Sequence, residues 1–305
     1  MSRRSATGWD EAVGVKKRGK YAAETLGWVL GEYRRSPSYQ NLKPATKKAY
    51  EQAFDKLHAY GNEPLSGLRR AHILRIRDSL SSTPAIANSV LTVISVICNF
   101  ALDREIIDVD PSQRIKRLKI GEWRRWTDDE LTSFYERTYE AMRRVLVFAL
   151  FTGQRRSDLC RAVWSDIEGG AIRVVQQKTG AKLWVPIHPT LERHISEWRS
   201  EKTVTVTILA NSRHQPWSPS ILSTVFANET VRLGMGGCTI HGLRKTAAAK
   251  LAEAGCSTRQ IMAITGHSSL SEVERYTREA DQRRLANDAM DMLKPVAFKT
   301  GRNAL

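Results

Sequence analysis

The chain has 305 residues, and its 48 Lys and Arg against 32 Asp and Glu give a formal net charge of +16, which favours a polyanionic partner, nucleic acid before an anionic membrane surface. No apolar run approaches the ~20 residues that span a bilayer and no basic-then-apolar leader opens the chain, so we expect a soluble, cytoplasmic protein with no membrane contact. The length suits one small and one larger domain.

The first 23 residues are predicted to form a basic N-terminal arm. They carry Arg and Lys at six positions with little apolar content, which is typical of a flexible segment. A solvated tail and an arm that contacts DNA explain this composition equally well. Both interpretations stay open.

Residues 24–108 are predicted to form a small helical domain. Tyr50, Phe54 and Leu57 stand at i, i+4 and i+7, and Pro44 suits the first turn of their helix. A shorter helix is predicted at 71–80, and an apolar repeat over 86–101 predicts a longer one. Each helix would bury one face, which favours a compact bundle.

Residues 109–126 contain a proline near their start, are rich in Arg and Lys, and show no clear periodicity of apolar residues. We therefore predict a basic linker between domains. A charge run is usually a solvated face. Its place at the joint of a basic protein favours contact with phosphates instead. The predicted DNA-contacting residues of the linker and the helical domain are Lys47, Lys48, Arg114, Lys116, Arg117 and Lys119.

A second domain is predicted at 127–293, followed by a tail at 294–305. Thr127 and Glu130 form a capping box at its entrance, and an apolar helix over 141–151 ends at Gly153. Residues 172–176 and 183–187 alternate as the strands of a β-hairpin. Helices are predicted at 189–199, 218–233, 241–254, 258–265 and 279–293, and helical spacing also resumes over 154–164. The fold class is therefore mainly α with a small β-hairpin, an α+β domain.

Three local patterns in the second domain contain residues that suit phosphate chemistry. TGQRRSDL contains Arg155, which has the equally basic Arg156 beside it. HGLRKTAAAK places His241 and Arg244 at i and i+3, on one face at a helix N-terminus that attracts anions. In ITGHSSLSEVERYTRE, Gly266 can end a helix and leave a histidine in a turn, nine residues before a tyrosine with basic flanks. Each residue alone also has an ordinary structural explanation.

Together these patterns supply two guanidiniums, two imidazoles and a phenol. These are the groups that a nucleophilic attack on a phosphodiester needs when no metal takes part. Guanidiniums bind non-bridging oxygens in pairs and neutralise charge in the transition state. A phenol of pKa ~10 needs cationic surroundings or a base, which histidine can supply. The four cysteines and seven histidines show no metal-binding spacing, so we expect no metal and no cofactor.

In this order the patterns TG-x-R, H-x-x-R, GH and Tyr resemble the tyrosine recombinase family, the lambda-type phage integrases. The resemblance covers residues 127–276, and the helical domain resembles that family's core-binding, SAM-like domain. It implies a two-domain clamp around DNA and a lysine on the hairpin, for which Lys178 fits and Lys182 is the alternative, with Asp158 as a supporting acid. The implied catalytic residues are Arg155, Lys178, His241, Arg244, His267 and, as nucleophile, Tyr276.

The sequence departs from the family pattern at two positions. Gly242 stands where Asp or Asn often follows the first histidine, and Thr265 stands where Leu often precedes GH. Neither departure removes a reacting group. The resemblance therefore implies an active enzyme.

The implied activity is site-specific recombination through a 3′-phosphotyrosine intermediate, by a homotetramer on double-stranded DNA, to integrate or excise a phage or other mobile element. A directionality factor or DNA-bending protein is an additional partner that the resemblance leaves open. The alternatives are a recombinase that resolves chromosomes or plasmids, a type IB topoisomerase, and a sequence-specific regulator of the same fold without catalysis.

Overall fold

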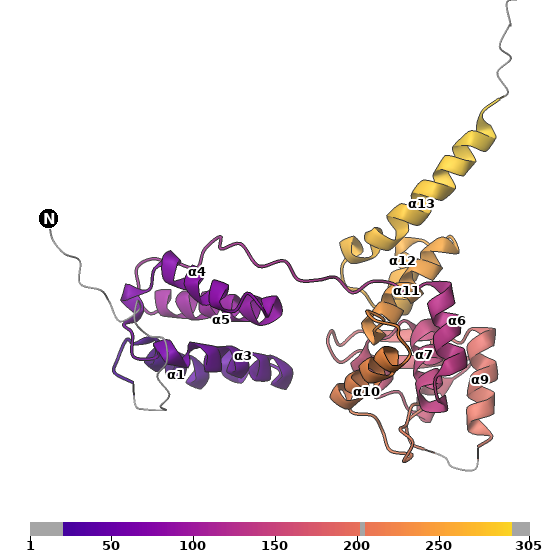
Figure 1. Cartoon of the computed structure of the whole chain (residues 1–305), viewed down its shortest axis with the longest axis horizontal. Helices are drawn as coiled ribbons and strands as arrows, with labels where there is room; N and C mark the ends of the chain where they lie inside the picture. The colour runs from indigo at the N-terminus through magenta and orange to yellow at the C-terminus, as the bar shows by residue number, and fades with distance from the viewer. Residues whose placement is uncertain (1–20, 202–204, 295–305) are drawn as a thin grey trace, which may run out of the picture. The chain divides into compact units, whose positions relative to one another are not determined.

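The computed structural model describes residues 21–201 and 205–294, which divide into two compact units that meet at Gly121 and Glu122 (Figure 1). Most of the predicted N-terminal arm (residues 1–20) and nearly all of the predicted tail (residues 295–305) lie outside the described residues. The two units are described separately.

The first unit is a helical bundle, as predicted. Its helices are α1 (Leu26–Arg35), α2 (Pro37–Gln40), α3 (Pro44–Leu57), α4 (Arg70–Ser79) and α5 (Pro84–Leu102), with 3-10 turns η2 (His58–Tyr60) and η3 (Leu65–Gly67). Prolines begin α2, α3 and α5, where a missing backbone N–H costs no hydrogen bond. Leu30, Phe54, Ile73 and Ile97 are almost fully buried in its core.

Helix α5 corrects one prediction from the sequence. At 19 residues and a mean hydropathy of 2.0 it is long and apolar enough to cross a membrane, although the sequence was expected to hold no such run. Ten of its residues are buried in the first unit, and they include Val90, Val93 and Ile97. Its apolar character is therefore that of a core helix.

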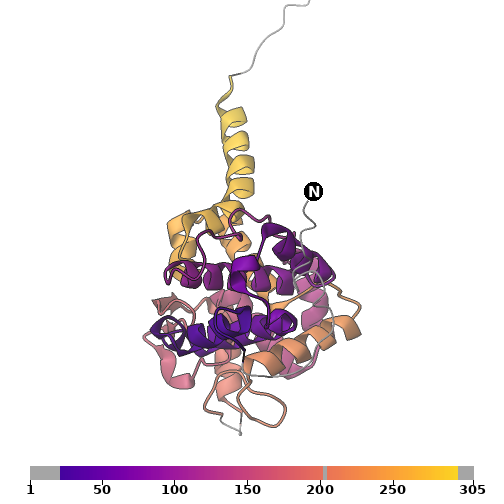
Figure 2. The same cartoon turned by 90° about the vertical axis from the view of Figure 1, so that its left-hand side faces the viewer.

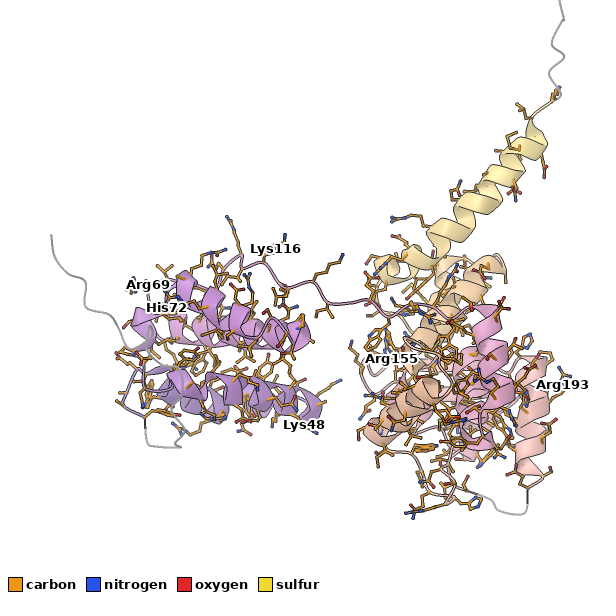
Figure 3. All side chains as sticks on the ribbon, in the orientation of Figure 1. Lys48, Arg69, His72, Lys116, Arg155 and Arg193 are labelled. Carbon is orange, nitrogen blue, oxygen red and sulfur yellow. The ribbon has the colours of Figure 1, made fainter. Side chains whose placement is uncertain are left out.

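Part of the predicted linker is fastened to the first unit. Arg77 donates a hydrogen bond of 2.9 Å to the Lys116 carbonyl, and the Asn88 side chain bonds both the N–H and the carbonyl of Leu118 at 2.9 and 2.8 Å. Ile115 packs against the core of the bundle. Residues 113–118 thus follow α4 and α5, and Lys116 lies on this stretch (Figure 3).

The second unit is mainly helical with one small antiparallel sheet, which confirms the predicted fold class. Its elements are α6 (Asp128–Arg137), α7 (Glu140–Thr152), α8 (Arg156–Leu159), η4 (Trp164–Asp166), β1 (Ile167–Glu168), β2 (Ala171–Val175), β3 (Lys182–Pro186), α9 (Pro189–Arg199), α10 (Pro219–Arg232), α11 (Ile240–Glu253), α12 (Thr258–Thr265) and α13 (Leu270–Met292). The strand order is β1-β2-β3, and Ile172 pairs with Val185. Strand β1 adds a short third strand to the predicted hairpin.

Three helix ends have the capping residues that the sequence predicted. The capping box at α6 is present, with the Glu130 N–H 3.2 Å from the Thr127 hydroxyl and the Thr127 N–H 2.9 Å from the Glu130 carboxylate. Gly153 and Gly266 end α7 and α12 in the left-handed conformation, at φ of 62° and 69°. The helix expected over 154–164 is limited to α8, because the chain turns into η4 and β1.

Helix α13 begins nine residues before the predicted helix at 279–293. Tyr276 therefore lies inside a helix, and the predicted start of that helix at residue 279 is wrong. Val273 and Thr277 are buried, and Tyr276 packs with Val273 against α11 and α12. The C-terminal part of α13 extends away from the rest of the second unit (Figures 1 and 2).

Candidate active site

A cavity of about 650 Å³ in the second unit collects four of the six predicted catalytic residues. They come from three places: the residue before α8, the turn between β2 and β3, and the first turn of α11. Arg155 is marked in Figure 3. No carboxylate is among the described residues that line the cavity, which are Trp123, Gln154, Arg155, Arg156, Ser157, Lys178, Ser223, Phe226, Ala227, Cys238, Thr239, Ile240, His241 and Arg244.

Arg244 is the most constrained of these groups. It is only 3% exposed, and its Nη1 donates to the carbonyls of Gly153 at 2.8 Å and Thr265 at 2.6 Å. Burial, with the nearby charge of Arg155, lowers its pKa to about 10. Its Nη2 is buried and has no hydrogen-bond partner among the described residues. An anion in the cavity would supply both the missing acceptor and the missing negative charge.

The two neighbouring arginines, 155 and 156, differ in how they are held. Arg155 donates to the Gln176 side chain and, at 3.4 Å, to the Gly266 carbonyl. Arg156 is exposed and bonds the Ser223 hydroxyl. Arg155 is thus fixed by the segments that carry the other site residues, which favours it over Arg156 as the phosphate-binding group.

His241 lies in the first turn of α11, and its ring meets the ring of Trp123 edge-on at 6.2 Å. Burial lowers its pKa, and the charges of Arg244 and Lys245 lower it further. The unliganded imidazole is therefore uncharged near neutral pH. Trp123 lines the same cavity and was not singled out in the sequence, where it is only one aromatic residue in a basic stretch.

Gly242 is required by the segment that enters the second unit. A Cβ atom at this position would lie 2.7 Å from the Arg124 carbonyl oxygen and 3.1 Å from the Trp126 ring. The Trp126 indole N–H also donates to the Thr239 carbonyl at 3.0 Å. The departure from the family's Asp or Asn thus brings this segment against the start of α11.

Thr265 determines which nitrogen of His267 carries the proton. Its hydroxyl lies 2.7 Å from the Ile261 carbonyl and 2.7 Å from His267 Nδ1. A carbonyl only accepts, so the hydroxyl proton is donated to Ile261 and Nδ1–H must donate to Thr265. Nε2 of His267 then keeps its lone pair. Burial, with the charges of Arg244 and Arg155, lowers the pKa of His267 to about 3.

Tyr276 lies beside this group but does not line the cavity. Its ring centroid is 6.4 Å from that of His267. Burial raises the pKa of its phenol, while Arg275 and Arg244 lower it. Arg275 forms an ion pair of 2.5 Å with Glu122, the first residue of the second unit. The nucleophile predicted from the sequence is therefore near the cations yet protonated in this state.

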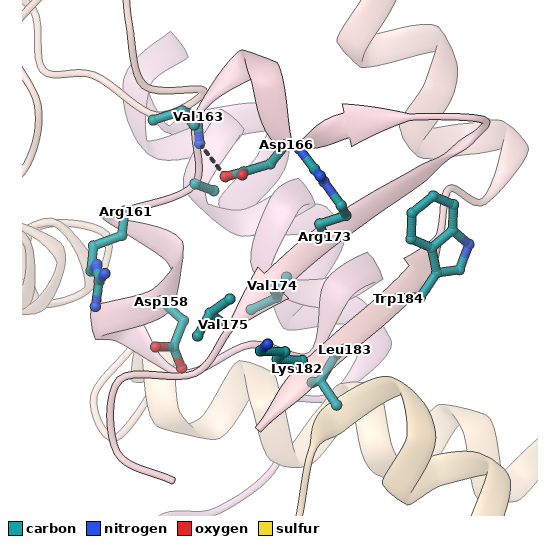
Figure 4. Close-up of a pocket in the computed structure, with 11 residues that line it drawn as sticks. Asp158, Arg161, Val163, Asp166, Arg173, Val174, Val175, Lys182, Leu183 and Trp184 are labelled. Carbon is teal, nitrogen blue, oxygen red and sulfur yellow. Dashed lines mark hydrogen bonds between the residues drawn. The ribbon is translucent and has the colours of Figure 1, made fainter. Parts of the chain in front are cut away.

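The hairpin separates its two candidate lysines. Lys178 lines the cavity with Arg155 and Arg244, whereas Lys182 lines a second cavity of about 640 Å³ with Asp158 and other residues (Figure 4). Asp158 is 4% exposed and accepts the Gln177 N–H at 2.9 Å, so it holds the start of the turn that carries Lys178. This geometry favours Lys178 over the alternative.

The predicted DNA-contacting cations lie in the first unit and are mostly exposed. Lys48, in α3, and Lys116 are marked in Figure 3. Lys47 is partly buried, donates to the Gln40 carbonyl at 2.7 Å and lies over the Tyr39 ring. Arg117 bonds the Thr92 hydroxyl at 2.9 Å. Contact of these residues with DNA stays a prediction, as it does for Arg114 and Lys119.

Residues 125–283, about half of the chain, match the model of the phage integrase family. The small sheet and all the cationic residues that line the cavity lie within this match, and the chain belongs to that family.

Individual relatives agree with this assignment. The integrase of Escherichia phage HK022 is 34% identical over 145 residues, which are 44% of this chain and 40% of the relative. A lambda integrase dimer bound to a COC′ core site has a TM-score of 0.73 at 25% identity, over 81% of this chain and 97% of that one. A lambda integrase tetramer bound to a Holliday junction has a TM-score of 0.72 at 26% identity, over 81% and 79%. The chain spans less than half the length of the curated relatives it matches.

Proposed function

We propose that this protein is a site-specific DNA recombinase that cuts and rejoins strands through a covalent link at Tyr276. The cavity that holds Arg155, Lys178, His241 and Arg244 without a carboxylate carries this proposal, because only an anion balances its charge. Membership of the phage integrase family makes a DNA phosphodiester the natural anion. The enzyme would integrate or excise a phage or other mobile element.

The arrangement suits an in-line displacement at phosphorus. Arg155 and Arg244 bind the non-bridging oxygens, and the buried Nη2 of Arg244 is a donor ready for one of them. The phenol oxygen of Tyr276 bonds to phosphorus as the bond from phosphorus to the 5′ oxygen breaks. Lys178 protonates that leaving oxygen. A later attack by a 5′-hydroxyl reverses these steps and releases the phenol.

The phenol proton needs an acceptor, and Nε2 of His267 is the candidate. Its lone pair is free because Nδ1–H is bonded to Thr265. A pKa of about 3 makes it a weak base as long as the charged side chains that line the cavity are all cations. A bound phosphate adds negative charge beside the ring and raises this pKa, so the base would gain strength only with DNA in place.

We further propose double-stranded DNA as the partner and a homotetramer as the acting assembly. Lambda integrase, a structural relative, forms a tetramer on a Holliday junction, and two exchanging duplexes need four strand cuts. The first unit and the basic residues 113–119 would contact the phosphate backbone. Action on DNA in the cytoplasm fits this function, and a directionality or DNA-bending factor would be an additional partner.

The test is covalent capture. Duplexes with a randomised core and a nick beside it would be incubated with the protein, denatured, and examined for DNA that stays bound; the captured DNA would be sequenced to identify the site. We expect an adduct with the wild type and none with Tyr276→Phe at equal DNA binding. Binding without an adduct would favour a regulator. An adduct with relaxation of supercoils but no strand exchange would favour a topoisomerase.

A further inference from the structure

Gln176 is a buried amide at the end of β2 whose hydrogen-bonding capacity is completely used. It is 1% exposed. Its Nε2 donates to the Gln154 side chain at 2.9 Å and to the Thr265 carbonyl at 2.8 Å. Its Oε1 accepts from Arg155 and, at 3.0 Å, from the Thr179 hydroxyl. Two donors and two lone pairs are all that an amide side chain offers.

The partners of Gln176 belong to three separate segments of the candidate site. Arg155 is itself a predicted phosphate-binding group, and Thr179 follows Lys178 in the hairpin turn. The Thr265 carbonyl also accepts from Arg244 at 2.6 Å, and it lies two residues before His267. One amide therefore joins the segments that carry the proton donor, Arg155 and the second histidine, and it shares the Thr265 carbonyl with Arg244.

Gly266 shows how closely the structure is built around this amide. A Cβ atom at Gly266 would lie 2.4 Å from Gln176 Nε2, closer than non-bonded atoms approach. Its φ of 69° also favours glycine. The glycine before His267 is thus needed both to end α12 and to leave room for the Gln176 side chain.

We propose that Gln176 is a positioning residue for the reaction, which holds the Lys178 turn in register with Arg155 and with the turn of His267. This inference rests on the proposed recombinase function and adds a residue that the family patterns in the sequence did not single out. Without the amide, the turn would lose its tie through Thr179. Lys178 would be the group most displaced, because residues 177–180 of this turn are all exposed. Proton delivery to the 5′ oxygen would then be the step most impaired.

The adjacent Gln177 offers a matched control. It is exposed, and its hydrogen bond to Asp158 uses the backbone N–H, which a substitution keeps. Gln176→Met preserves length and removes both donors and both acceptor sites, whereas Gln177→Met makes the same change one residue away. Thr179→Val keeps the amide and removes its tie to the turn, together with the longer bond of 3.4 Å that the Ala181 N–H donates to the same hydroxyl.

The experiment measures single-turnover cleavage by the full-length protein of two duplexes that carry the site identified by covalent capture. One has the ordinary 5′ oxygen at the cut and the other has sulfur there, which leaves without a proton. We expect Gln176→Met to cut the oxygen duplex roughly 100-fold more slowly than Gln177→Met, in the range of one general-acid contribution. On the sulfur duplex we expect the difference in rate between the two variants to be at least ten-fold smaller, with DNA affinity unchanged. Thr179→Val should show the same recovery from a smaller loss.

Two results would overturn the proposal. Gln176→Met and Thr179→Val could cut the oxygen duplex within about threefold of Gln177→Met, well below a general-acid contribution. Alternatively, both variants could be slowed equally on oxygen and sulfur, which would indicate general damage and no role in positioning the proton donor. Thr179→Val keeps the buried amide, so it tests the proposal even if Gln176→Met does not fold. Adduct formation by Gln177→Met tests the recombinase function separately.

Discussion

The second unit contains two cavities of similar size that are both lined by cations and differ in whether acidic side chains line them too. The first, of about 650 Å³, holds Arg155, Lys178 and Arg244 and has no carboxylate among the described residues that line it. The second, of about 640 Å³, is lined by Arg161, Arg173 and Lys182 but also by Asp158 and Asp166 (Figure 4). The comparison teaches that cations alone do not indicate an anion site. Cations in a cavity whose described lining residues include no acid do.

The hairpin makes the same comparison at the scale of single residues. Lys178 and Lys182 are four residues apart, and each is exposed. Lys178 lies in the turn and lines the first cavity, whereas Lys182 begins β3 and lines the second. The first two predictions that follow test whether the cations of the first cavity affect cleavage more than those of the second.

The largest effect is expected at Arg244. Arg244→Ala removes a buried charge and the donor without a partner, so we expect single-turnover cleavage to slow by about 10³-fold, in the upper range for one transition-state donor. Arg161→Ala in the second cavity is the control and should stay within about threefold of the wild type, since no charge forms there. Equal losses in the two variants would remove the distinction between the cavities.

The two lysines should differ next. Lys178→Ala is expected to slow cleavage by about 10²-fold, because the 5′ oxygen would leave without a proton, and Lys182→Ala by no more than about threefold. The measurement is the rate of adduct formation on the ordinary duplex, followed by the duplex with sulfur at the cut. On the sulfur duplex, Lys178→Ala should form the adduct at close to the wild-type rate. A larger loss in Lys182→Ala would assign the acid to the other lysine.

Thr265→Val should have an intermediate effect and slow cleavage about tenfold. This is a fraction of the contribution of one acid-base group. The change removes the acceptor of the His267 Nδ1–H and frees the ring to adopt the other tautomer. The pH dependence of cleavage should change with it, because the basic nitrogen is no longer fixed. The control is Thr224→Val, which removes an exposed hydroxyl of α10 that likewise donates to the carbonyl four residues earlier. Identical pH profiles for the two variants would contradict this role of Thr265.

The smallest effect concerns stability and pH. His267 has a lowered pKa of about 3 in the folded protein, against about 6.5 when unfolded, so the unfolded state binds the extra proton between these values. Stability is therefore expected to fall as pH falls through this window, by about 1 kcal/mol between pH 6 and pH 5. The free energy of unfolding of His267→Gln, measured by urea titration, should fall by that much less over the same pH interval. An equal pH dependence in both proteins would mean that the ring is not kept neutral.

Local features of this protein were predictable from the sequence, and features that depend on distant partners were not. The capping box at Thr127 and Glu130 and the glycine that ends α12 act within a few residues, and the structure has both. The start of α13 was missed because Val273 and Thr277 are buried by α11 and α12, in a segment that is otherwise polar. Tertiary packing there outweighs the local pattern.

The candidate site divides in the same way. The motifs grouped Arg155, His241 and Arg244, which line one cavity, and the family resemblance preferred Lys178 with Lys182 as the alternative. The sequence alone did not show that the two lysines line different cavities. The meaning of Gly242 depends on the Arg124 carbonyl, more than a hundred residues earlier in the chain. Gln176 had no signal of its own, because an amide becomes informative only when its four partners are known.

The central claim is that Tyr276 becomes covalently attached to DNA, and mapping the adduct tests it most directly. The captured complex would be digested with nuclease and protease, and its peptides measured by mass spectrometry. We predict a single modified peptide, which contains Tyr276 and carries the mass of a nucleotide phosphate on the phenol oxygen. A stable adduct on any other residue, or none on a site that the protein binds and cuts, would contradict the account.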